Sequence, residues 1–160
     1  MDFNMISLLL WLDEIAIISF GFIGGVYFAF SFFVMQSLNK VSHPEAIRTM
    51  NSINSVILKS PFMLLFFFSS FIASIIFLEN LILYKFISNE GFASLIFLIG
   101  MFLCTAKKNV PLNKKLADFD FNDPSRNPKI EWNYYYKNWI KWNHIRTGAC
   151  FLSMVLLILK

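Results

Sequence analysis

The chain has 160 residues, the length of one domain, and it is 57% hydrophobic but only 15% charged, with a formal net charge of +4. In soluble domains about a quarter of the residues are charged. In this chain the apolar residues also occur in long blocks. The composition therefore excludes an ordinary soluble domain and indicates an integral membrane protein with a single domain over residues 1–160.

The first apolar block covers about residues 15–38, close to the ~20 residues that cross a bilayer. An apolar stretch at residues 3–12 precedes it, and Asp13 and Glu14 separate the two. Because an acid at the bilayer centre costs about 2.5–3.5 kcal/mol, we expect the acidic pair at the membrane surface. Residues 3–12 are then expected in the interface or against the helical bundle. A proton-relay role for the acidic pair inside the membrane is the alternative.

Three further apolar blocks predict spans at about residues 61–84, 92–109 and 142–159. A polar helix is predicted ahead of them, within residues 39–60, because Ser42 and Glu45 have the spacing of a capping box. Pro111 is expected to prevent a simple continuation of the third span. The aromatic cluster at residues 132–136 is expected at the headgroup level, where Trp and Tyr concentrate.

The two cysteines, Cys104 and Cys150, each lie inside an apolar run. No CxxC pair marks a redox site. Both are therefore predicted to be buried small residues rather than partners in a disulfide.

Basic residues gather on one side of this four-span arrangement. Twelve of the 14 lie within residues 39–60 and 107–141 or at their edges. The positive-inside rule places these segments in the cytoplasm and both termini outside, in the inner membrane of a bacterium. The basic residues are interpreted as topology signals and contacts to anionic lipids, not as a nucleic-acid surface. The expected fold is all-α: four transmembrane helices in an up-down bundle, with an extra interfacial or juxtamembrane helix.

The most informative stretch begins at Trp139, where a polar segment becomes the last apolar run. On a helix, Trp139, Asn143 and Arg146 lie at i, i+4 and i+7 and share one face. The predicted topology brings further polar side chains to the same cytoplasmic end: His43, Arg48, Asn51, Asn54, Asn109, Asn113 and His144. A ligand site is therefore predicted at that end.

Three motifs occur in order along the chain: Met50-Asn-Ser-Ile-Asn54 before Pro61-Phe62, Asn109-Val-Pro-Leu-Asn113, and Trp139-Ile-Lys-Trp-Asn-His-Ile-Arg-Thr147. With these motifs, and with Gly21, Gly25, Phe30 and Val34-Met35 in the first span, the chain resembles the DUF1772, or anthrone oxygenase, family of small four-span membrane proteins. The resemblance covers nearly the whole chain. One departure is Gln36, where the family usually has a proline; it concerns the end of a helix and not the polar cluster.

The resemblance implies a specific chemistry. Fungal members named for their activity are implied to oxidise anthrones to anthraquinones with molecular oxygen and without metal or flavin, so no cofactor and no metal are expected. The enzyme hypothesis is a cofactor-independent oxygenase acting on a hydrophobic aromatic substrate from the bilayer. His144 is the candidate base, since its ordinary pKa is about 6.5, and Arg146 is the candidate for stabilising the oxyanion. The residues assigned to substrate binding are Asn51, Asn54, Asn113, Trp139 and Asn143.

Other interpretations stay open at this point. A histidine at headgroup level is the favoured alternative for His144, because it only borders the face that Asn143 and Arg146 share. Asn113 and Arg146 fit a role in capping and tying the third and fourth helices. The whole chain also fits a non-catalytic scaffold, lipid-binding protein or complex subunit. A haem or metal site through His43 and His144 is disfavoured because no cluster has ligand spacing. The expected partners are membrane lipids and a hydrophobic small molecule, with a homo-oligomer left open and no nucleic acid.

Overall fold

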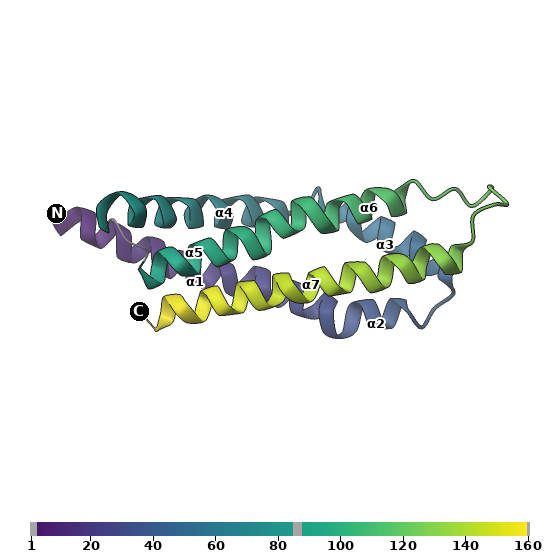
Figure 1. Cartoon of the computed structure of the whole chain (residues 1–160), viewed down its shortest axis with the longest axis horizontal. Coiled ribbons are helices and arrows are strands. Elements are labelled where there is room, and N and C mark those ends of the chain that lie inside the picture. The colour runs from purple at the N-terminus through teal and green to yellow at the C-terminus, as the bar shows by residue number, and fades with distance from the viewer. Residues whose placement is uncertain (1–2, 85–87, 160) are drawn as a thin grey trace.

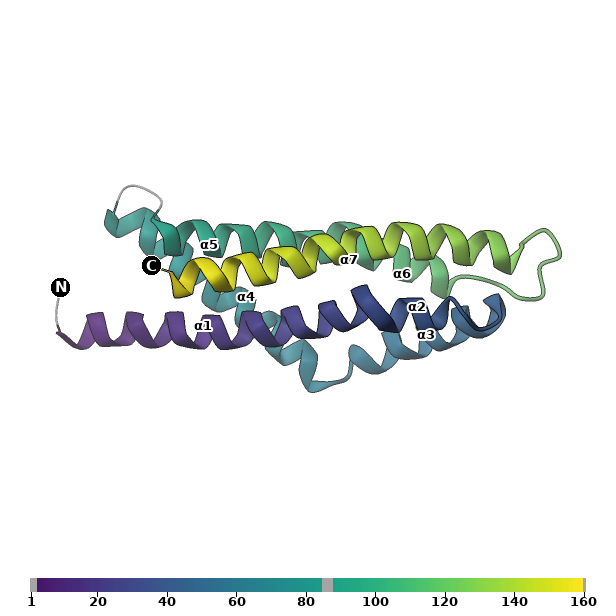
Figure 2. The ribbon, with the colours of Figure 1, turned by 90° about the horizontal axis from the view of Figure 1, so that it is seen from below.

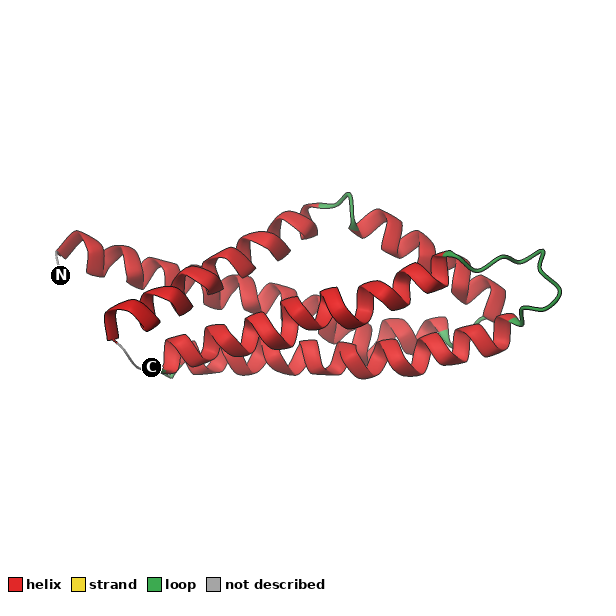
Figure 3. Ribbon diagram, turned by 45° about the horizontal axis from the view of Figure 1, so that its top comes forward, coloured by secondary structure: helices red, strands yellow, loops and turns green. Residues whose placement is uncertain are grey.

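The computed structural model describes residues 3–84 and 88–159, and the described part of the chain contains helices and no strand. Helices make up 87% of the structure, which confirms the predicted all-α class (Figure 3). Within the described residues, three helical stretches are long and apolar enough to cross a membrane: Trp11–Leu38, Pro61–Ile82 and Asn89–Ala117. The molecule is elongated, and its N- and C-terminal ends lie together, opposite the loop at 118–127 (Figure 1).

The first stretch is one continuous helical rod. Helix α1 (Phe3–Ala29) passes through the π-helical segment η1 (Phe30–Val34) into α2 (Met35–Leu38). The helix does not break at the acidic pair, so residues 3–12 are its first turns rather than a separate surface segment. Asp13 is buried and Glu14 is exposed, and a helix accommodates both because neighbouring residues point in different directions.

Helix α3 (His43–Ile57) begins as predicted. The Glu45 amide donates to the Ser42 hydroxyl at 3.4 Å, and the Ser42 amide donates to the Glu45 carboxylate at 3.1 Å, which confirms the capping box. The hydrogen bonds from Ser42 hold the pKa of Glu45 below its ordinary value. Helix α4 (Pro61–Glu79) follows and continues into η2 (Asn80–Tyr84), close to the second predicted span.

The next stretch is longer than predicted. Helix α5 (Asn89–Phe97), the π-helical segments η3 (Leu98–Leu103) and η4 (Thr105–Asn109), and α6 (Val110–Ala117) follow one another without a loop. The expectation that Pro111 prevents this continuation is wrong. Pro111 lies in the first turn of α6, next to the wider turn of η4, where a missing amide hydrogen costs least.

Helix α7 (Pro128–Ile158) is the longest continuous α-helix among the described residues, with 31 residues and a length of about 47 Å at 1.5 Å per residue. It contacts α1 and α5, and also α3 and α6 (Figure 2). Trp132 and Tyr135 are buried inside the protein. Both rings pack against α3 and α6. The position of the aromatic cluster at headgroup level stays a prediction, because burial inside the protein does not give a depth in the membrane.

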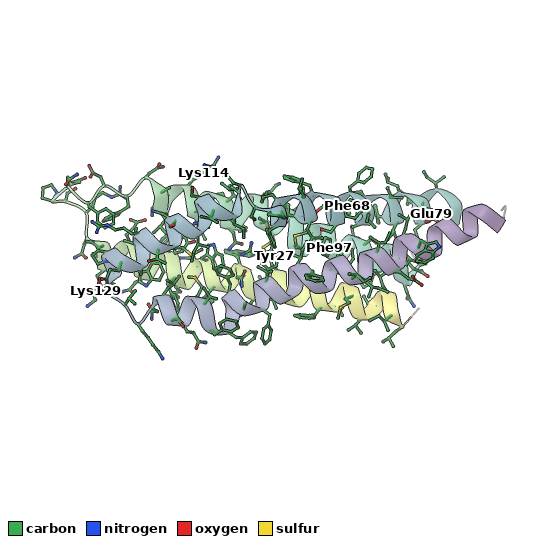
Figure 4. The ribbon with its side chains drawn as sticks, turned by 180° about the vertical axis from the view of Figure 1, so that it is seen from behind. Tyr27, Phe68, Glu79, Phe97, Lys114 and Lys129 are labelled. Atoms are coloured by element: carbon green, nitrogen blue, oxygen red, sulfur yellow. The ribbon has the colours of Figure 1, made fainter. Side chains whose placement is uncertain are left out.

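The structure has two apolar cores, one behind the other along its length. The span core includes Phe20, Ile23, Ile76, Phe97 and Leu157. The basic-end core includes Met35, Ile47, Met50, Leu116 and Trp132. Lys114 and Lys129 lie towards the basic end, whereas Phe68, Phe97 and Glu79 lie towards the other (Figure 4). Both cysteines are buried and free, as predicted.

The contact between η3 and α7 depends on two small residues, Gly100 and Ala149. A Cβ atom added at Gly100 would approach the Ala149 side chain more closely than two methyl groups can. We expect Gly100→Ala to destabilise the protein by about 1–3 kcal/mol through overpacking, measured by thermal unfolding in detergent. Adding Ala149→Gly to this variant should recover most of the lost stability. Gly148→Ala is the control, since its Cβ meets nothing within 4 Å; equal effects at both glycines would contradict the prediction.

Candidate functional site

A cavity of about 250 Å³ lies where the two cores meet. Apolar and aromatic side chains from α1, η1, α3, α4 and η3 form most of its wall, including Phe30, Phe62 and Phe102. The polar side chains in its wall are Tyr27, Asn54, Thr105, Asn113, Trp139 and Arg146. The volume is near the lower end of the range for small-molecule sites, about 300–1,000 Å³, so the cavity suits a compact ligand.

Of the described side chains in this wall, Arg146 alone carries a fixed charge. It is 4% exposed, and its Nη1 and Nη2 donate to Thr105 Oγ1 at 3.3 Å and to Asn143 Oδ1 at 2.6 Å. The guanidinium carbon lies 4.2 Å from the ring centroid of Tyr27 and 5.1 Å from that of Trp139. Its Nε has no hydrogen-bond partner. A buried guanidinium with a free donor is suited to bind an oxygen atom that carries negative charge.

Within the described residues, no carboxylate forms a salt bridge with this guanidinium. The salt bridges among the described residues join Glu131 to Lys115 at 3.7 Å and to Arg126 at 3.5 Å, and neither involves Arg146. Removing a cation from water without a counter-ion is costly. The site is therefore electrostatically prepared for an anionic or strongly polarised ligand.

Asn143 does not line the cavity, and it holds the guanidinium in place through a hydrogen bond. The amide is fully buried; its Nδ2 donates to the Tyr27 carbonyl oxygen and to Ser31 Oγ, both at 2.7 Å. Because a guanidinium only donates hydrogen bonds, the oxygen of the Asn143 amide must face Arg146. All of these contacts are within the protein, so Asn143 positions Arg146 rather than facing the cavity.

Asn113 is the centre of a second network. Its Oδ1 accepts from Trp139 Nε1 and Tyr135 Oη, both at 2.9 Å, and its Nδ2 donates to Asn54 Oδ1 at 3.1 Å. The indole N–H can only donate, which fixes the orientation of the Asn113 amide and, through it, of the Asn54 amide. Burial raises the pKa of the Tyr135 phenol, so this group remains a donor.

The two networks leave two unused donors in the cavity wall, Asn54 Nδ2 and Arg146 Nε. Both atoms are buried, and none of the other described side chains in this wall has an unpartnered buried polar atom. A ligand that pairs with these two donors must therefore present acceptor oxygens, as a carbonyl, enolate or phenolate does.

The structure brings together most of the residues predicted for the site. Trp139, Asn143 and Arg146 are all buried on one face of α7, as predicted, and Asn54 and Asn113 join Trp139 and Arg146 in the cavity wall. Asn51 lies outside the wall, and its Nδ2 donates to the Leu116 carbonyl at 3.2 Å.

His144 lies apart from these residues. It is exposed, it is absent from the cavity wall, and its ring packs on Phe32 with 5.6 Å between centroids. A helical residue next to Asn143 points about 100° away from it, so the burial of Asn143 directs His144 outwards. The described residues contain no group of three or more His, Cys, Asp or Glu that could hold a metal.

Sequence reasoning missed Tyr27 and Thr105, which lie within apolar spans. Tyr27 packs on Arg146, and its hydroxyl donates to Met101 Sδ at 3.7 Å; Thr105 accepts from Arg146. The available signal was their polarity inside a span, which marks a residue as a functional candidate. The π-helical segments η1, η3 and η4 also contribute to the wall, and π-helical turns often occur at functional sites.

Comparison with known proteins adds one match. The family model described as anthrone oxygenase matches residues 61–156, which is more than half of the chain and includes Asn113, Trp139 and Arg146. A search of curated proteins and a search of solved structures each found no match.

Proposed function

This chain belongs to the anthrone oxygenase family, and from that premise we propose that it is a cofactor-independent oxygenase whose aromatic carbon-acid substrate binds beside Arg146. The observation that carries the proposal is the pair of unused donors, Arg146 Nε and Asn54 Nδ2, in a cavity walled by aromatic rings. Two donors and a buried cation are complementary to the oxygen of an enolate.

The proposed chemistry follows from the charge of Arg146. A carbon acid loses the proton of a C–H bond, and its electron pair becomes delocalised onto the neighbouring ketone oxygen. The guanidinium stabilises that oxygen, which lowers the pKa of the bound carbon acid. The electron-rich carbanion then reacts with dioxygen; one oxygen atom becomes the new ketone and the other leaves in water. Tyr27 and Trp139 supply flat surfaces beside the ring.

We also propose that the chain forms one domain with four spans, and that α7 supplies the fourth at about residues 142–159. Among the polar residues that reduce its hydropathy, Asn143, Arg146 and Thr147 are buried inside the protein, and His144, near the start of the span, is exposed. The apolar side chains that it exposes in this part are Ile145, Leu152, Val155 and Ile158. In this arrangement residues 39–60 and 107–141 lie in the cytoplasm and both termini outside, in the inner membrane of a bacterium.

The test is dioxygen consumption by the protein purified in detergent, with a simple anthrone as substrate and the anthraquinone product quantified. We expect uptake above the spontaneous rate, unchanged by a metal chelator. Folded wild-type protein without substrate-dependent uptake would contradict the oxygenase proposal.

His144→Ala serves as the matched control and as a prediction of its own. Because the imidazole lies outside the cavity wall, we expect His144→Ala to keep its rate within about twofold of wild type and to keep the same pH profile. A loss of 100-fold or more, with the fold intact, would instead assign the base to His144 as the sequence analysis does.

A second candidate function is ligand binding without chemistry. The cavity wall contains Tyr27 and Arg146 but, among the described residues, no His, Asp, Glu, Lys or Cys that would act as an ordinary base. A lipid-binding protein or a subunit of a membrane complex would need no such group. Quenching of tryptophan emission by an anthrone without dioxygen uptake would favour this candidate.

A further inference from the structure

A second hollow, of about 350 Å³, lies directly beside the Arg146 cavity, between α3 and α6. We call it the side groove. Its own wall includes Asn51, Ser55, Lys114 and Ala117, and it shares Asn54, Ile57, Leu58, Val110 and Asn113 with the cavity. The two hollows therefore meet at the hydrogen bond between Asn54 and Asn113.

The side groove has unsatisfied polar atoms of both kinds. Asn51 Oδ1 is a buried acceptor and Asn54 Nδ2 a buried donor, and neither has a partner. They are three residues apart on α3 and so lie on neighbouring positions of one helix face. Water both donates and accepts, and a hollow of this size far exceeds the roughly 10–15 Å³ of probe volume that one water needs. These two atoms offer a water an acceptor and a donor at this point of the side groove, whereas most of its remaining lining is apolar.

The two hollows reach the surface at residues of different polarity. Ser55 and Lys114 are exposed in the wall of the side groove, and Lys114 lies towards the basic end of the protein (Figure 4). The Arg146 cavity instead has Phe67, which is 57% exposed, in its wall, whereas the exposed Leu58 belongs to the part of the wall that both hollows share. One approach suits water and the other suits a hydrophobic ligand from the bilayer.

We propose that the side groove is a water-filled passage between the basic end of the protein and the Arg146 cavity, with the Asn54–Asn113 hydrogen bond as the barrier between them. The passage supplies what the cavity wall lacks, a route for protons. When the C–H bond of the carbon acid breaks, its electron pair stays on the substrate and its proton passes to water as hydronium, which leaves through the side groove. This assignment of the proton rests on the proposed oxygenase function; the water-filled passage does not.

The passage is tested first by cysteine labelling of the full-length protein. Cys104 and Cys150 are replaced by Ala, and a single cysteine is introduced at Ile57, which lines both hollows and makes no side-chain hydrogen bond. We expect a small cationic methanethiosulfonate to modify Ile57→Cys at least tenfold faster than Phe67→Cys. Adding Ala117→Trp, which fills the side groove, should slow labelling at position 57 at least tenfold.

Ser52→Trp is the matched control, because Ser52 is exposed on α3 and lines neither hollow. It should leave the labelling rate at position 57 unchanged. If Ile57→Cys does not react, or if Ala117→Trp does not slow its reaction, the proposal is overturned. Asn54→Cys gives a second inner position, with the same expectation.

Dioxygen consumption with an anthrone then tests the proton route. Ala117 does not line the Arg146 cavity, so Ala117→Trp should leave the dissociation constant of the anthrone unchanged while it lowers the rate of uptake at least tenfold. An unchanged rate in a variant with blocked labelling would overturn the proton route. Labelling as expected in a wild-type protein without uptake would keep the passage and refute the oxygenase, so the two failures are distinguishable.

Discussion

Replacing Arg146 by Met should reduce kcat for anthrone oxidation by about 10²–10³-fold, the usual effect of removing a donor that stabilises an oxyanion. Met keeps an unbranched apolar side chain at this position and lacks the guanidinium. The charge, the free Nε and the contact to Tyr27 are lost together. Dioxygen uptake under saturating anthrone measures the effect.

Two further observations separate catalysis from structure at this position. Arg146→Lys keeps the charge but loses the planar fork that reaches both Thr105 and Asn143, so its rate should lie between those of wild type and Arg146→Met. Arg146→Met leaves the buried Asn143 Oδ1 without its donor, but it also removes a buried cation that has no salt bridge among the described residues. Because these two effects oppose each other, the unfolding temperature should stay close to that of wild type. A folded Arg146→Met with wild-type kcat would refute the oxyanion role. Unfolding at the assay temperature would instead assign Arg146 to joining α7 to η4.

Asn113→Ala should produce the largest loss of stability among the site variants. The change leaves two buried donors, Trp139 Nε1 and Tyr135 Oη, and the acceptor Asn54 Oδ1 without their partner. An unsatisfied buried group costs about 1–3 kcal/mol; since the three effects are not fully additive, we expect a total of roughly 2–5 kcal/mol. Chemical unfolding in mild detergent, followed by tryptophan emission, measures the loss.

Asn113→Asp is the companion variant, because a carboxylate keeps both acceptor contacts; it loses the donor to Asn54 and adds a part-buried negative charge. It should lose less stability than Asn113→Ala. Tyr135→Phe, which removes one donor together with its need for a partner, should cost less still, about 1 kcal/mol. Equal stability of Asn113→Ala and wild type would show that this network does not hold α6 to α7.

These predictions depend on side chains that the sequence places only in part. Apolar blocks of bilayer length predict the long helices, and the capping box predicts where α3 begins. The helical period also predicts that Trp139, Asn143 and Arg146 share one face. Each of these properties is local, because it depends on residues within one helix. The motifs shared with the family are likewise read from the chain alone.

The cavity is a property of the tertiary structure. The Asn143 amide meets the Tyr27 carbonyl 116 residues away, and Asn113 meets Asn54 59 residues away. No local pattern contains the depth or the rotation at which these helices pack. The same packing engages Asn143 and Asn113 in hydrogen bonds within the protein. From the sequence both are candidates for substrate binding, and Asn113 is also a candidate for tying the third and fourth helices together.

His144 and Pro111 show the same division between local pattern and packing. The sequence identifies His144 as the titratable group nearest the cluster, but the face that α7 turns towards α1 buries Asn143 and leaves His144 outside. Pro111 is a helix breaker in isolation, yet the π-helical turn before it carries the chain on into α6. The sequence by itself therefore determined the helices and their polar faces, because hydrogen bonding and hydrophobicity act within a segment. Tertiary packing decided which polar atoms meet a partner and which remain free for a ligand, because those contacts join helices that are distant in the chain.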